Sequence, residues 1–545
     1  MPTATTQNLT LIKKHPLWRV LEVVPGALTW TGIFFPIIFS AFFPAVAASF
    51  IIVYTITWLF RSIKLSINLY RSFNLVKEAL KTDWEKLTIL LDHPEKIDYE
   101  IKRIQEKNPK KKKATIHFYR DLKAKINLLK QKQQYKKSKD IIHAIIFVTY
   151  KESYQIVRES IKSYTLSEYD PSGIIFVFAV EEADKENALA ISHKLEKEFG
   201  DKFHKFITTI HPKNLPGEIK GKSANATHAA KQLKKHLDEK NIPYENVIIS
   251  NFDADTVVNP KYFSELTFKY LTTLDRTEMA YQPTHMFHNN IWDVPMMIRM
   301  VALSCTFWRM AESMEQDKYK SFSSRALSFK TVVDVDYWDP SVIPEDSRQY
   351  WSAYLIYDGR HKLVPIYCPI YMDAVLSETY IKTFKSQYNQ LRRWAWGVCD
   401  FPFMAINLWK HPRISLYDKI YRIYEFLKNS FFWATGPILI TFMGFLPGMV
   451  NPSFRDTVLA YNLPKIMSSI LTFSSGGIIV CAIISLVLIP ENTKRSLFGK
   501  ISLIIQWLLV PVVSIILSAI PALDAQTRLM FGKYLEYRVT EKARK

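Results

Sequence analysis

The fold of this chain is decided by the stretch Val247-Ile248-Ile249-Ser250-Asn251-Phe252-Asp253-Ala254-Asp255. It predicts a short buried strand that ends in two carboxylates one residue apart. Two acids in such a place are costly unless a positive charge lies between them. Mg²⁺ is usually bound by one or two carboxylates together with phosphate oxygens of a substrate. The stretch therefore indicates a divalent cation, Mg²⁺ or Mn²⁺, that holds a phosphorylated ligand, although an Asp-x-Asp pattern also occurs in ordinary turns.

Strand-like and helix-like segments alternate before this stretch. Strands are predicted at 141–149, 174–180 and 206–210, and helices at 154–164, 185–199 and 223–237. Such alternation predicts parallel βαβ units in a doubly wound α/β sheet, where ligands bind at the carboxyl ends of the strands. Acidic residues stand at three of these ends, namely Glu152, the pair Glu181 and Glu182, and the pair Asp253 and Asp255. The absence of a Gly-x-Gly-x-x-Gly or Walker loop from the sequence argues against dinucleotide-binding and P-loop folds.

The composition indicates a large, basic protein with segregated apolar runs. The chain has 545 residues, which is too many for one compact core, so two or more domains are expected. Its formal net charge of +21 suits nucleic acid, an anionic membrane face or anionic substrates. Aromatic residues are sparse in its most basic segment, which argues against a nucleic-acid partner. The four cysteines, at positions 305, 368, 399 and 481, are scattered and indicate neither a zinc site nor a disulfide framework.

The N-terminal region is polar to residue 16 and almost free of charge from Pro25 to Phe60. This length predicts two transmembrane helices with a tight turn near Pro44. A buried hairpin in a soluble protein is the alternative. Arg61 and Lys64 follow at once, so the positive-inside rule places the next region in the cytoplasm. We expect no cleaved signal peptide, because no short apolar core precedes a small-residue cleavage site.

Residues 62–140 are helical in pattern and strongly basic, with lysine runs at 110–113 and 136–139. We expect a solvated helical linker with charged faces. The alternative is docking on the anionic leaflet of a membrane, which contributes about 1 kcal/mol for each basic residue near the surface.

The C-terminal third contains further apolar segments. Residues 416–428 are amphipathic and are expected to lie on the membrane surface, whereas 431–450 and 466–489 are long enough to span it. Residues 501–522 are also apolar, but carry two prolines and a glutamine. Two spans before the central region and three after it would put the basic tail, 528–545, outside the cell, against the positive-inside rule. Either residues 501–522 lie in the interface or re-enter, or one of the other spans is wrong.

Three further motifs carry chemistry. Lys222 opens a predicted helix, where its charge and the helix N-terminus can meet a diphosphate, although an ordinary exposed lysine fits equally well. Asp346 follows Glu345 in a polar turn and is a candidate general base, or alternatively the N-cap of a helix over 347–356. The run Gln390-Leu391-Arg392-Arg393-Trp394 offers arginine for phosphate and a flat tryptophan face for a sugar, or alternatively a basic helix at a membrane.

In chain order, these motifs resemble those of the membrane-embedded family-2 glycosyltransferases, the inverting group that includes cellulose, chitin and hyaluronan synthases. The resemblance covers about residues 141–396 and the flanking spans. It implies a cytoplasmic GT-A-type nucleotide-sugar-binding domain inserted between N-terminal and C-terminal transmembrane helices of the cell membrane. The expected units are the N-terminal tail and two spans (1–61), the linker (62–140), the glycosyltransferase domain (141–412), an interface helix with the C-terminal membrane helices (413–522), and a basic cytoplasmic tail (523–545).

The resemblance also implies roles on the donor side. Thr149, Tyr150 and Glu152 resemble the first-strand motif that receives the nucleotide base. Glu181 and Glu182 stand where the family has a second-strand Asp motif, and which acid faces the base or ribose stays open.

Around the diphosphate, Lys222 is similar to the lysine that contacts it, and Asp253 and Asp255 match the metal-binding Asp-x-Asp. Gln282 lies in a strand that resembles the one lining the donor site. In the family's chemistry, the metal neutralises the leaving diphosphate, and Lys222 and Arg393 would assist it.

On the acceptor side, Glu345 and Asp346 match the Glu-Asp pair in which Asp is the base, with Pro344 in place of the usual Thr. Gln390, Arg393 and Trp394 match the Gln-x-x-Arg-Trp motif of the polymer-forming branch, and the tryptophan would stack on the acceptor sugar. The family's Phe-Cys-Gly-Ser-like acceptor loop has no clean match, and 288–290 and 304–305 are the places to look.

The tail segment Tyr537-Arg538-Val539-Thr540-Glu541-Lys542 resembles the Phe-x-Val-Thr-x-Lys gating loop of cellulose synthase. In that family the loop is cytoplasmic and closes over the nucleotide, so Thr540 and Lys542 would cap the diphosphate. A cytoplasmic tail supports the interfacial or re-entrant interpretation of residues 501–522.

The expected reaction is transfer of a sugar from a nucleotide-sugar, by resemblance a UDP-sugar, to a growing polysaccharide, with inversion at the anomeric carbon. Three hypotheses stay open: a processive synthase that extrudes its product, a non-processive transferase with a lipid-linked acceptor, and a non-catalytic membrane scaffold or transporter. The expected partners are the donor, a glycan or lipid-linked acceptor and anionic membrane lipids, without nucleic acid.

Overall fold

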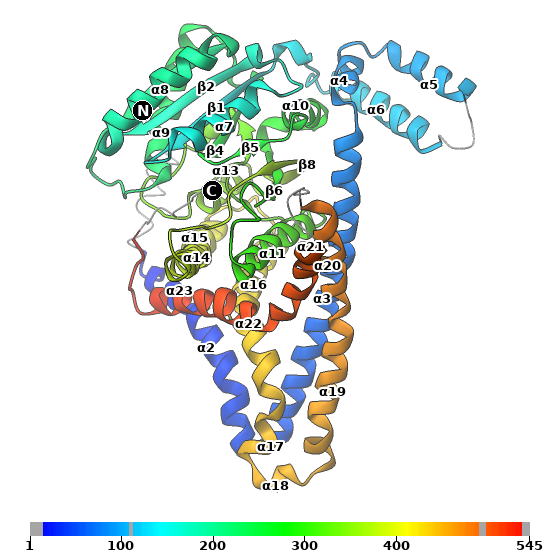
Figure 1. Ribbon diagram of the computed structural model, residues 1–545, viewed down its shortest axis with the longest axis vertical. Helices are drawn as coiled ribbons and strands as arrows, with labels where there is room; N and C mark the ends of the chain where they lie inside the picture. The colour runs from blue at the N-terminus through cyan, green and yellow to red at the C-terminus, as the bar shows by residue number, and fades with distance from the viewer. Residues whose placement is uncertain (1–14, 108–112, 490–496, 537–545) are drawn as a thin grey trace.

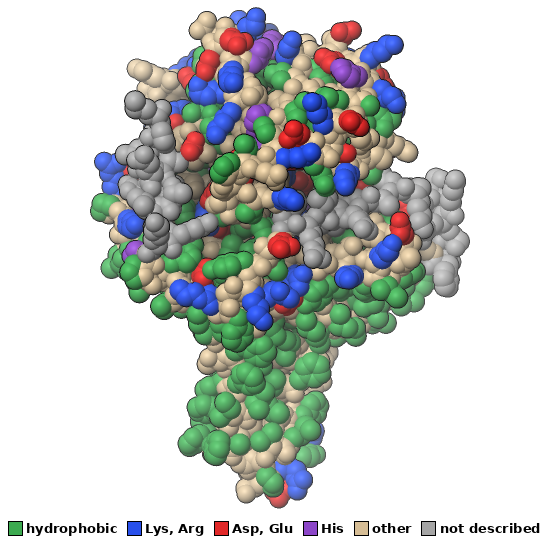
Figure 2. Space-filling view, turned by 90° about the vertical axis from the view of Figure 1, so that its left-hand side faces the viewer, with side chains coloured by type: hydrophobic (Ala, Val, Ile, Leu, Met, Phe, Trp, Pro, Cys, Tyr) green, Lys and Arg blue, Asp and Glu red, His purple; other side chains and the backbone are tan. Residues whose placement is uncertain are grey.

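The computed structural model describes residues 15–107, 113–489 and 497–536 of the chain. It has an α/β head on a narrow helical stem (Figure 1). The predicted α/β domain between apolar N-terminal and C-terminal helices is therefore confirmed. The surface of the stem is largely apolar, and charged side chains gather on the head and return at the stem tip (Figure 2).

The stem begins with two antiparallel helices, α2 (Trp18–Phe42) and α3 (Pro44–Lys81), which meet at the predicted turn. They pack against α16 (Leu416–Phe442), α17 (Leu446–Val450), α19 (Val458–Ser474) and α20 (Gly476–Leu488). Helix α3 has 38 residues and is about 57 Å long, which exceeds the roughly 30 Å of a membrane's hydrocarbon core. Its C-terminal half accordingly runs beside the head (Figure 1). The short α18 (Pro452–Arg455) forms the stem tip.

Glycines let the stem helices approach closely. A Cβ atom added at Gly32 on α2 would lie 2.2 Å from the ring of Phe431 on α16. A Cβ at Gly436 on α16 would lie 2.7 Å from Trp58 on α3, and one at Gly444 would lie 2.6 Å from the Met467 sulfur on α19. Large side chains therefore fill the space between the stem helices at these crossings, as in helix pairs that pack through small residues.

The amphipathic residues Leu416–Lys428 do not form the separate surface helix expected from the sequence. They are the first half of α16, which continues without a break into the apolar stretch. The helix continues because no glycine or proline occurs between Leu416 and Ser430, so the change from amphipathic to apolar is not a change of backbone conformation.

Within the described residues, five helical segments are long and apolar enough to cross a membrane, and the last, Ile501–Met530, differs from the others in form. It is broken into α21 (Leu497–Ile505), η10 (Gln506–Leu509), α22 (Val510–Ser514), the π-helical η11 (Ile515–Ala519) and α23 (Ile520–Met530). The α23 end lies across the molecule between head and stem (Figure 1). One side of the segment is an exposed apolar stripe formed by Ile501, Ile504, Ile505, Leu508, Val512, Ile516 and Ile520.

The linker is helical, as predicted, with α4 (Trp84–Asp92), α5 (Lys96–Lys107) and α6 (Lys113–Gln131). Helix α4 buries Trp84, Leu87 and Leu91 in the head core. Helices α5 and α6 project sideways at the level of the head, away from the apolar stem (Figure 1). This position at the level of the head favours the solvated linker over docking on a membrane at the level of the stem.

The head contains one eight-stranded sheet in the order β3-β2-β1-β4-β7-β6-β8-β5. The four predicted strands are parallel neighbours: β1 (Ile142–Thr149), β2 (Ile174–Glu181), β3 (Lys205–His211) and β4 (Val247–Asp253). The other half mixes directions, because β7 (Ala326–Ser328) pairs antiparallel with β4 and β6. The remaining strands are β5 (Val257–Val258), β6 (Ala280–Met286) and β8 (Leu363–Tyr371).

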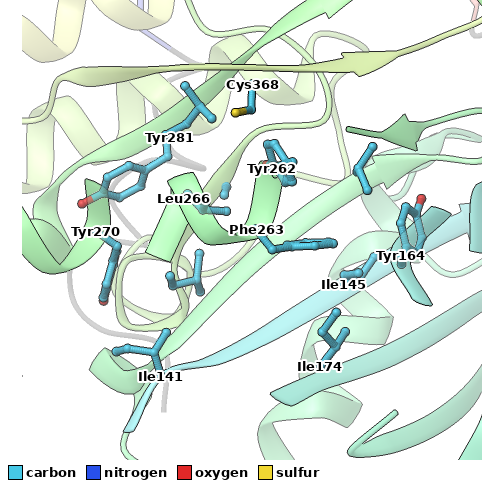
Figure 3. Packing of buried hydrophobic residues seen from close by; sticks show 14 of the residues in the cluster. Ile141, Ile145, Tyr164, Ile174, Tyr262, Phe263, Leu266, Tyr270, Tyr281 and Cys368 are labelled. Carbon is cyan, nitrogen blue, oxygen red and sulfur yellow. The ribbon is translucent and has the colours of Figure 1, made fainter. Parts of the chain in front are cut away.

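Helices cover both faces of the sheet. The predicted helices are α7 (Tyr154–Thr165), α8 (Lys185–Phe199) and α9 (Lys222–Glu239). The others in the head are α10 (Tyr262–Thr272), α11 (Met296–Glu312), α12 (Phe329–Asp334), α13 (Glu345–Ile356), α14 (Tyr380–Ala395) and α15 (Phe401–Lys410). Tyr262, Phe263 and Leu266 of α10 pack among Ile145 of β1 and Tyr164 of α7, as Figure 3 shows. Aromatic packing of this kind holds β1 and β4 rigidly, and both strands end at the site described next.

Candidate active site

The carboxyl ends of β1, β2 and β4 meet at one edge of the sheet. In the strand register, Val148 stands opposite Asp253, and Thr149 stands opposite Val180. The acids that follow these strands are thereby brought to the same edge, as the βαβ pattern predicts.

The loop after β1 closes on itself through Glu152. Its Oε2 atom accepts hydrogen bonds from Thr149 Oγ1 at 2.8 Å and from the Tyr150 backbone N–H at 2.5 Å. The next backbone N–H, that of Lys151, donates to Asp184 Oδ2 at 2.9 Å, and Lys151 has a positive φ of 66°. Glu152 therefore shapes this loop, and Asp184 links it to the loop after β2.

Glu181 and Glu182 point to the next strand instead. Glu181 and Glu218 bracket His211, with Nδ1 to Glu181 Oε2 at 3.1 Å and Nε2 to Glu218 Oε2 at 2.9 Å. Burial lowers the pKa of His211, but the two carboxylates outweigh it and the net shift is upward. Glu182 Oε2 accepts the Lys213 backbone N–H at 2.8 Å. Among the acids that follow β2, Asp184 is the one bonded to the β1 loop.

Lys222 and Asp253 form the central ion pair of the site. Lys222 is the first residue of α9, is only 9% exposed, and reaches Asp253 Oδ1 at 2.7 Å. Burial lowers the pKa of Lys222, yet the charges of Asp253, Asp346 and Glu345 together raise it above its ordinary value. The alternative of an ordinary exposed lysine is therefore wrong: this buried ammonium group faces three carboxylates.

Asp255 lies behind Asp253 and is 2% exposed. Its Oδ2 accepts the Asp373 backbone N–H at 2.8 Å, and its backbone oxygen accepts from Asn289 Nδ2 at 3.0 Å. Among the described residues, no group of three or more His, Cys, Asp and Glu side chains could hold a metal alone. Two carboxylates, of which the Asp253 side chain is 25% exposed, suit a cation that takes its other ligands from a diphosphate.

Asp346 faces this pair from α13. Glu345 and Asp346 are the first two residues of that helix and Pro344 is its N-cap, so the capping role considered for Asp346 is wrong. Its Oδ1 atom lies 3.2 Å from Nη1 of Arg325, a buried arginine that the sequence analysis missed. The neighbouring Glu345 is half-buried, and burial, followed by the charge of Asp346, raises its pKa to about 7.

A short loop, Ser321–Arg325, contacts both Asp253 and Asp346. The Ser324 hydroxyl accepts the Asp253 backbone N–H at 3.3 Å. Gln282 Oε1 accepts the Phe322 backbone N–H at 2.8 Å, and the Ser323 oxygen accepts from His285 Nε2 at 2.7 Å. Burial lowers the pKa of His285 to about 3, so this imidazole is neutral.

The sequence predicts the acceptor loop near 288–290 or 304–305. Asn289 contacts the Asp255 backbone oxygen, and the 321–325 loop contacts Asp253. The usable signal in the sequence was the small Ser323-Ser324 pair followed by arginine just before a strand.

The α14 motif lies on the far side of that loop. The Trp394 ring meets Phe322 edge-on at 5.3 Å and Phe287 at 6.1 Å, and Gln390 Oε1 accepts from Gln387 at 3.1 Å. Arg393 is close enough to lower the pKa of Glu345. A cleft of about 10 Å³ beside these residues is lined by Phe287, Val301, Ala302, Cys305, Asp373, Ala374, Val375, Gln387, Gln390 and Trp394. Such a cleft holds about one water molecule and no sugar.

Helix α23 joins this motif helix to the stem. Asp524 Oδ2 accepts from Tyr388 at 3.1 Å and from Arg392 Nη1 at 2.9 Å, both on α14. Tyr534, which follows α23, donates to Glu22 on α2 at 3.0 Å. Thr540 and Lys542 lie outside the described residues.

No family model matches this chain, and no curated protein sequence matches it. Among solved structures, it is similar to the mannosyltransferase PcManGT from Pyrobaculum calidifontis in complex with GDP-Man and Mn²⁺. That similarity has 13% identity and a TM-score of 0.35, over 68% of this chain and 86% of the other. It is also similar to S. aureus TarS, residues 1–349, in complex with UDP-GlcNAc, with 12% identity and a TM-score of 0.33, over 74% of this chain and 95% of the other.

Proposed function

We propose that this chain is a membrane-bound inverting glycosyltransferase of the family-2 type, which transfers a sugar from a nucleotide-sugar, a UDP-sugar by motif resemblance. The observation that carries the proposal is the buried Lys222–Asp253 ion pair, with Asp255 behind it and Asp346 facing it across the site. A lysine and two carboxylates at the strand ends suit a diphosphate and its cation, and a separate carboxylate suits a proton acceptor.

On the donor side, the nucleotide would lie over the β1 loop, held by Thr149 and Tyr150 with Asp184 beside them. The diphosphate would take the place beside Lys222 at the N-terminus of α9, where backbone N–H groups and the helix dipole favour an anion. Asp253 and Asp255 would hold Mg²⁺ or Mn²⁺, which supplies positive charge against the leaving diphosphate. Thr540 and Lys542 would cap the diphosphate, by resemblance to the gating loop.

On the acceptor side, Asp346 would take the proton of the attacking hydroxyl. The acceptor oxygen forms a bond to the anomeric carbon, the bond from that carbon to the diphosphate oxygen breaks, and the nucleoside diphosphate leaves. Attack opposite to the leaving group inverts the anomeric centre. Lys222, which is close to Asp253, and Arg393, which acts on Glu345, would stabilise the charge that develops on the diphosphate. Trp394 would give the acceptor sugar its stacking face.

The acceptor class has two candidates. The Gln390–Trp394 motif resembles the polymer-forming branch and supports a growing polysaccharide. A lipid-linked acceptor is supported by the stem, because Phe431, Trp58 and Met467 fill the helix crossings against glycines. A polysaccharide extruded through the stem would require these contacts to separate. A lipid-linked acceptor would only have to reach the head from the membrane surface.

For the membrane, we infer four crossings, made by α2, α3, α16 with α17, and α19 with α20. Residues 501–530 would lie in the interface, with their exposed stripe of isoleucines in the lipid and the broken backbone shielded by the head. Four crossings leave both ends of the chain on the side of the head. Arg61, Lys64 and the basic tail then place the head in the cytoplasm, against the anionic leaflet of the cell membrane.

The experiment is release of nucleotide from candidate donors by the purified protein in nanodiscs, with Mn²⁺, Mg²⁺ or EDTA. UDP-glucose, UDP-GlcNAc and GDP-mannose form the first panel. We expect metal-dependent release from one donor, its loss in Asp346→Asn, and its retention in Asp201→Asn, which changes an exposed acid far from the site. Silence with every donor and metal would support the scaffold or transporter alternative. Product length then separates a polymer from a single added sugar.

A further inference from the structure

Arg325 connects the two halves of the proposed reaction centre. It is 2% exposed and stands at the end of the 321–325 loop, directly before β7. Its backbone oxygen accepts the Asn251 N–H at 3.4 Å, which ties it to β4, the strand that ends at Asp253. Its side chain extends the other way, to the first turn of α13.

The guanidinium group of Arg325 holds that turn at several points. Nη1 donates to Asp346 Oδ1 at 3.2 Å, to the Asp346 backbone oxygen at 2.8 Å and to the Ser321 hydroxyl. Nη2 donates to Gln349 Oε1, one helical turn further on. The planar fork of arginine makes such contacts together, which a lysine ammonium group does not reproduce.

We propose that Arg325 is the positioning residue of the base: it holds Asp346 in place relative to the donor strand and sets a positive charge against that carboxylate. The inference rests on the proposed function and goes beyond it, because it names the residue that orients Asp346 and distinguishes it from the adjacent Glu345. The guanidinium group of Arg325 contacts Asp346 directly, and a close opposite charge favours the ionised form of an acid.

The other charges around Asp346 support this division. Lys222 on α9 faces both acids and Asp253, while Arg393 on α14 acts on Glu345. Burial, followed by the charge of Asp346, raises the pKa of Glu345 to about 7. Without the positive charge of Arg325, we expect the two adjacent acids to share a proton near neutral pH, which would make Asp346 a poorer proton acceptor.

The test uses the full-length protein in nanodiscs and the variants R325Q, R325K and R325Q/E345Q, with kcat/KM measured from pH 5 to pH 9. R325Q is expected to shift the acidic limb upward by about one pH unit, which lowers kcat/KM by up to about 10-fold at pH 6.5 and leaves it near the wild-type value at pH 8.5. The affinity for UDP should change less than twofold. R325K should keep the limb in place and lose only part of kcat. The double variant should return the limb toward wild type, because the competing acid is gone.

Two controls make the result decisive. R348K changes a different buried arginine, which lies on α13 and binds Asp400 and Asp339. Its role is structural, so the pH limb of this variant should stay unchanged. A fall in kcat that is equal at all pH values in R325Q would show a structural role only and overturn the proposal. If R325Q does not fold, R325K decides: an upward shift of its limb would also overturn the proposal.

A readout without activity separates this inference from the proposed function. In R325Q the acid pair should bind an extra proton in the folded state above its unfolded pKa, so stability should be lost as pH rises. The apparent Tm should therefore increase more in R325Q than in wild type between pH 8 and pH 6. An equal change would contradict the role of Arg325, whereas a wild-type protein inactive with every donor would contradict the proposed function alone.

Discussion

The proposed donor side of the site, around Asp253 and Lys222, lies at the sheet edge, whereas the proposed acceptor side, around Trp394, lies on helices and loops between the head and the apolar segments. The donor side is held by short contacts from buried residues, such as the 2.7 Å ion pair. The cleft beside Trp394 measures about 10 Å³. If the proposed roles hold, the two sides should respond differently to substitution.

The largest effect is expected on the donor side. Asp253→Asn and Asp255→Asn each remove a charge from the proposed cation site, and metal-dependent release of nucleotide should fall by about 1000-fold or more. The measurement is nucleotide release across a Mn²⁺ titration, with Asp201→Asn as the exposed control. If either variant kept more than a tenth of wild-type activity with an unchanged metal dependence, the donor side would be wrongly assigned.

The acceptor side should separate transfer from hydrolysis. Trp394→Ala removes the proposed stacking face, which is worth about 1 kcal/mol, and transfer should fall about 5-fold. Release of nucleotide to water should stay within twofold, because the donor contacts are untouched. The measurement compares labelled product with total nucleotide, and Trp409→Ala, which changes an exposed tryptophan, is the matched control. An equal loss of both activities would mean that Trp394 supports the donor side as well.

The same contrast explains how much the sequence predicts. Strand ends and helix starts follow from local periodicity, so Asp253, Lys222 and Asp346 were predicted as site residues, and the structure places them together. Arg325 was missed because it reaches the site through β7, a strand of only three residues with no readable period. The length of α16 was missed because hydrophobicity changes along it while the backbone does not.

Between the two sides, Glu345 should make stability depend on pH. Its folded pKa of about 7 lies above the ordinary value of 4.5, so the folded state binds more protons between these values and stability is lost as pH rises through 7. Glu345→Gln removes the ionised form. Its apparent Tm should exceed that of wild type by a few degrees at pH 8, with a smaller difference at pH 5. Thermal unfolding in nanodiscs at both pH values measures this, and a difference that does not change with pH would exclude Glu345 as the titrating group.

The smallest effect is expected where the acceptor side meets the membrane segments. Asp524 on α23 binds Tyr388 and Arg392 of α14, and Arg392 is two residues before Trp394. Asp524→Asn keeps the size of the side chain but weakens a partly exposed ion pair, which is worth about 1 kcal/mol or less. Transfer should therefore fall only about threefold, with nucleotide release to water unchanged. Asp456→Asn, an exposed acid at the stem tip, is the control and should alter neither. A loss that appears in nucleotide release as strongly as in transfer would show that α23 supports the whole head and not the acceptor side in particular.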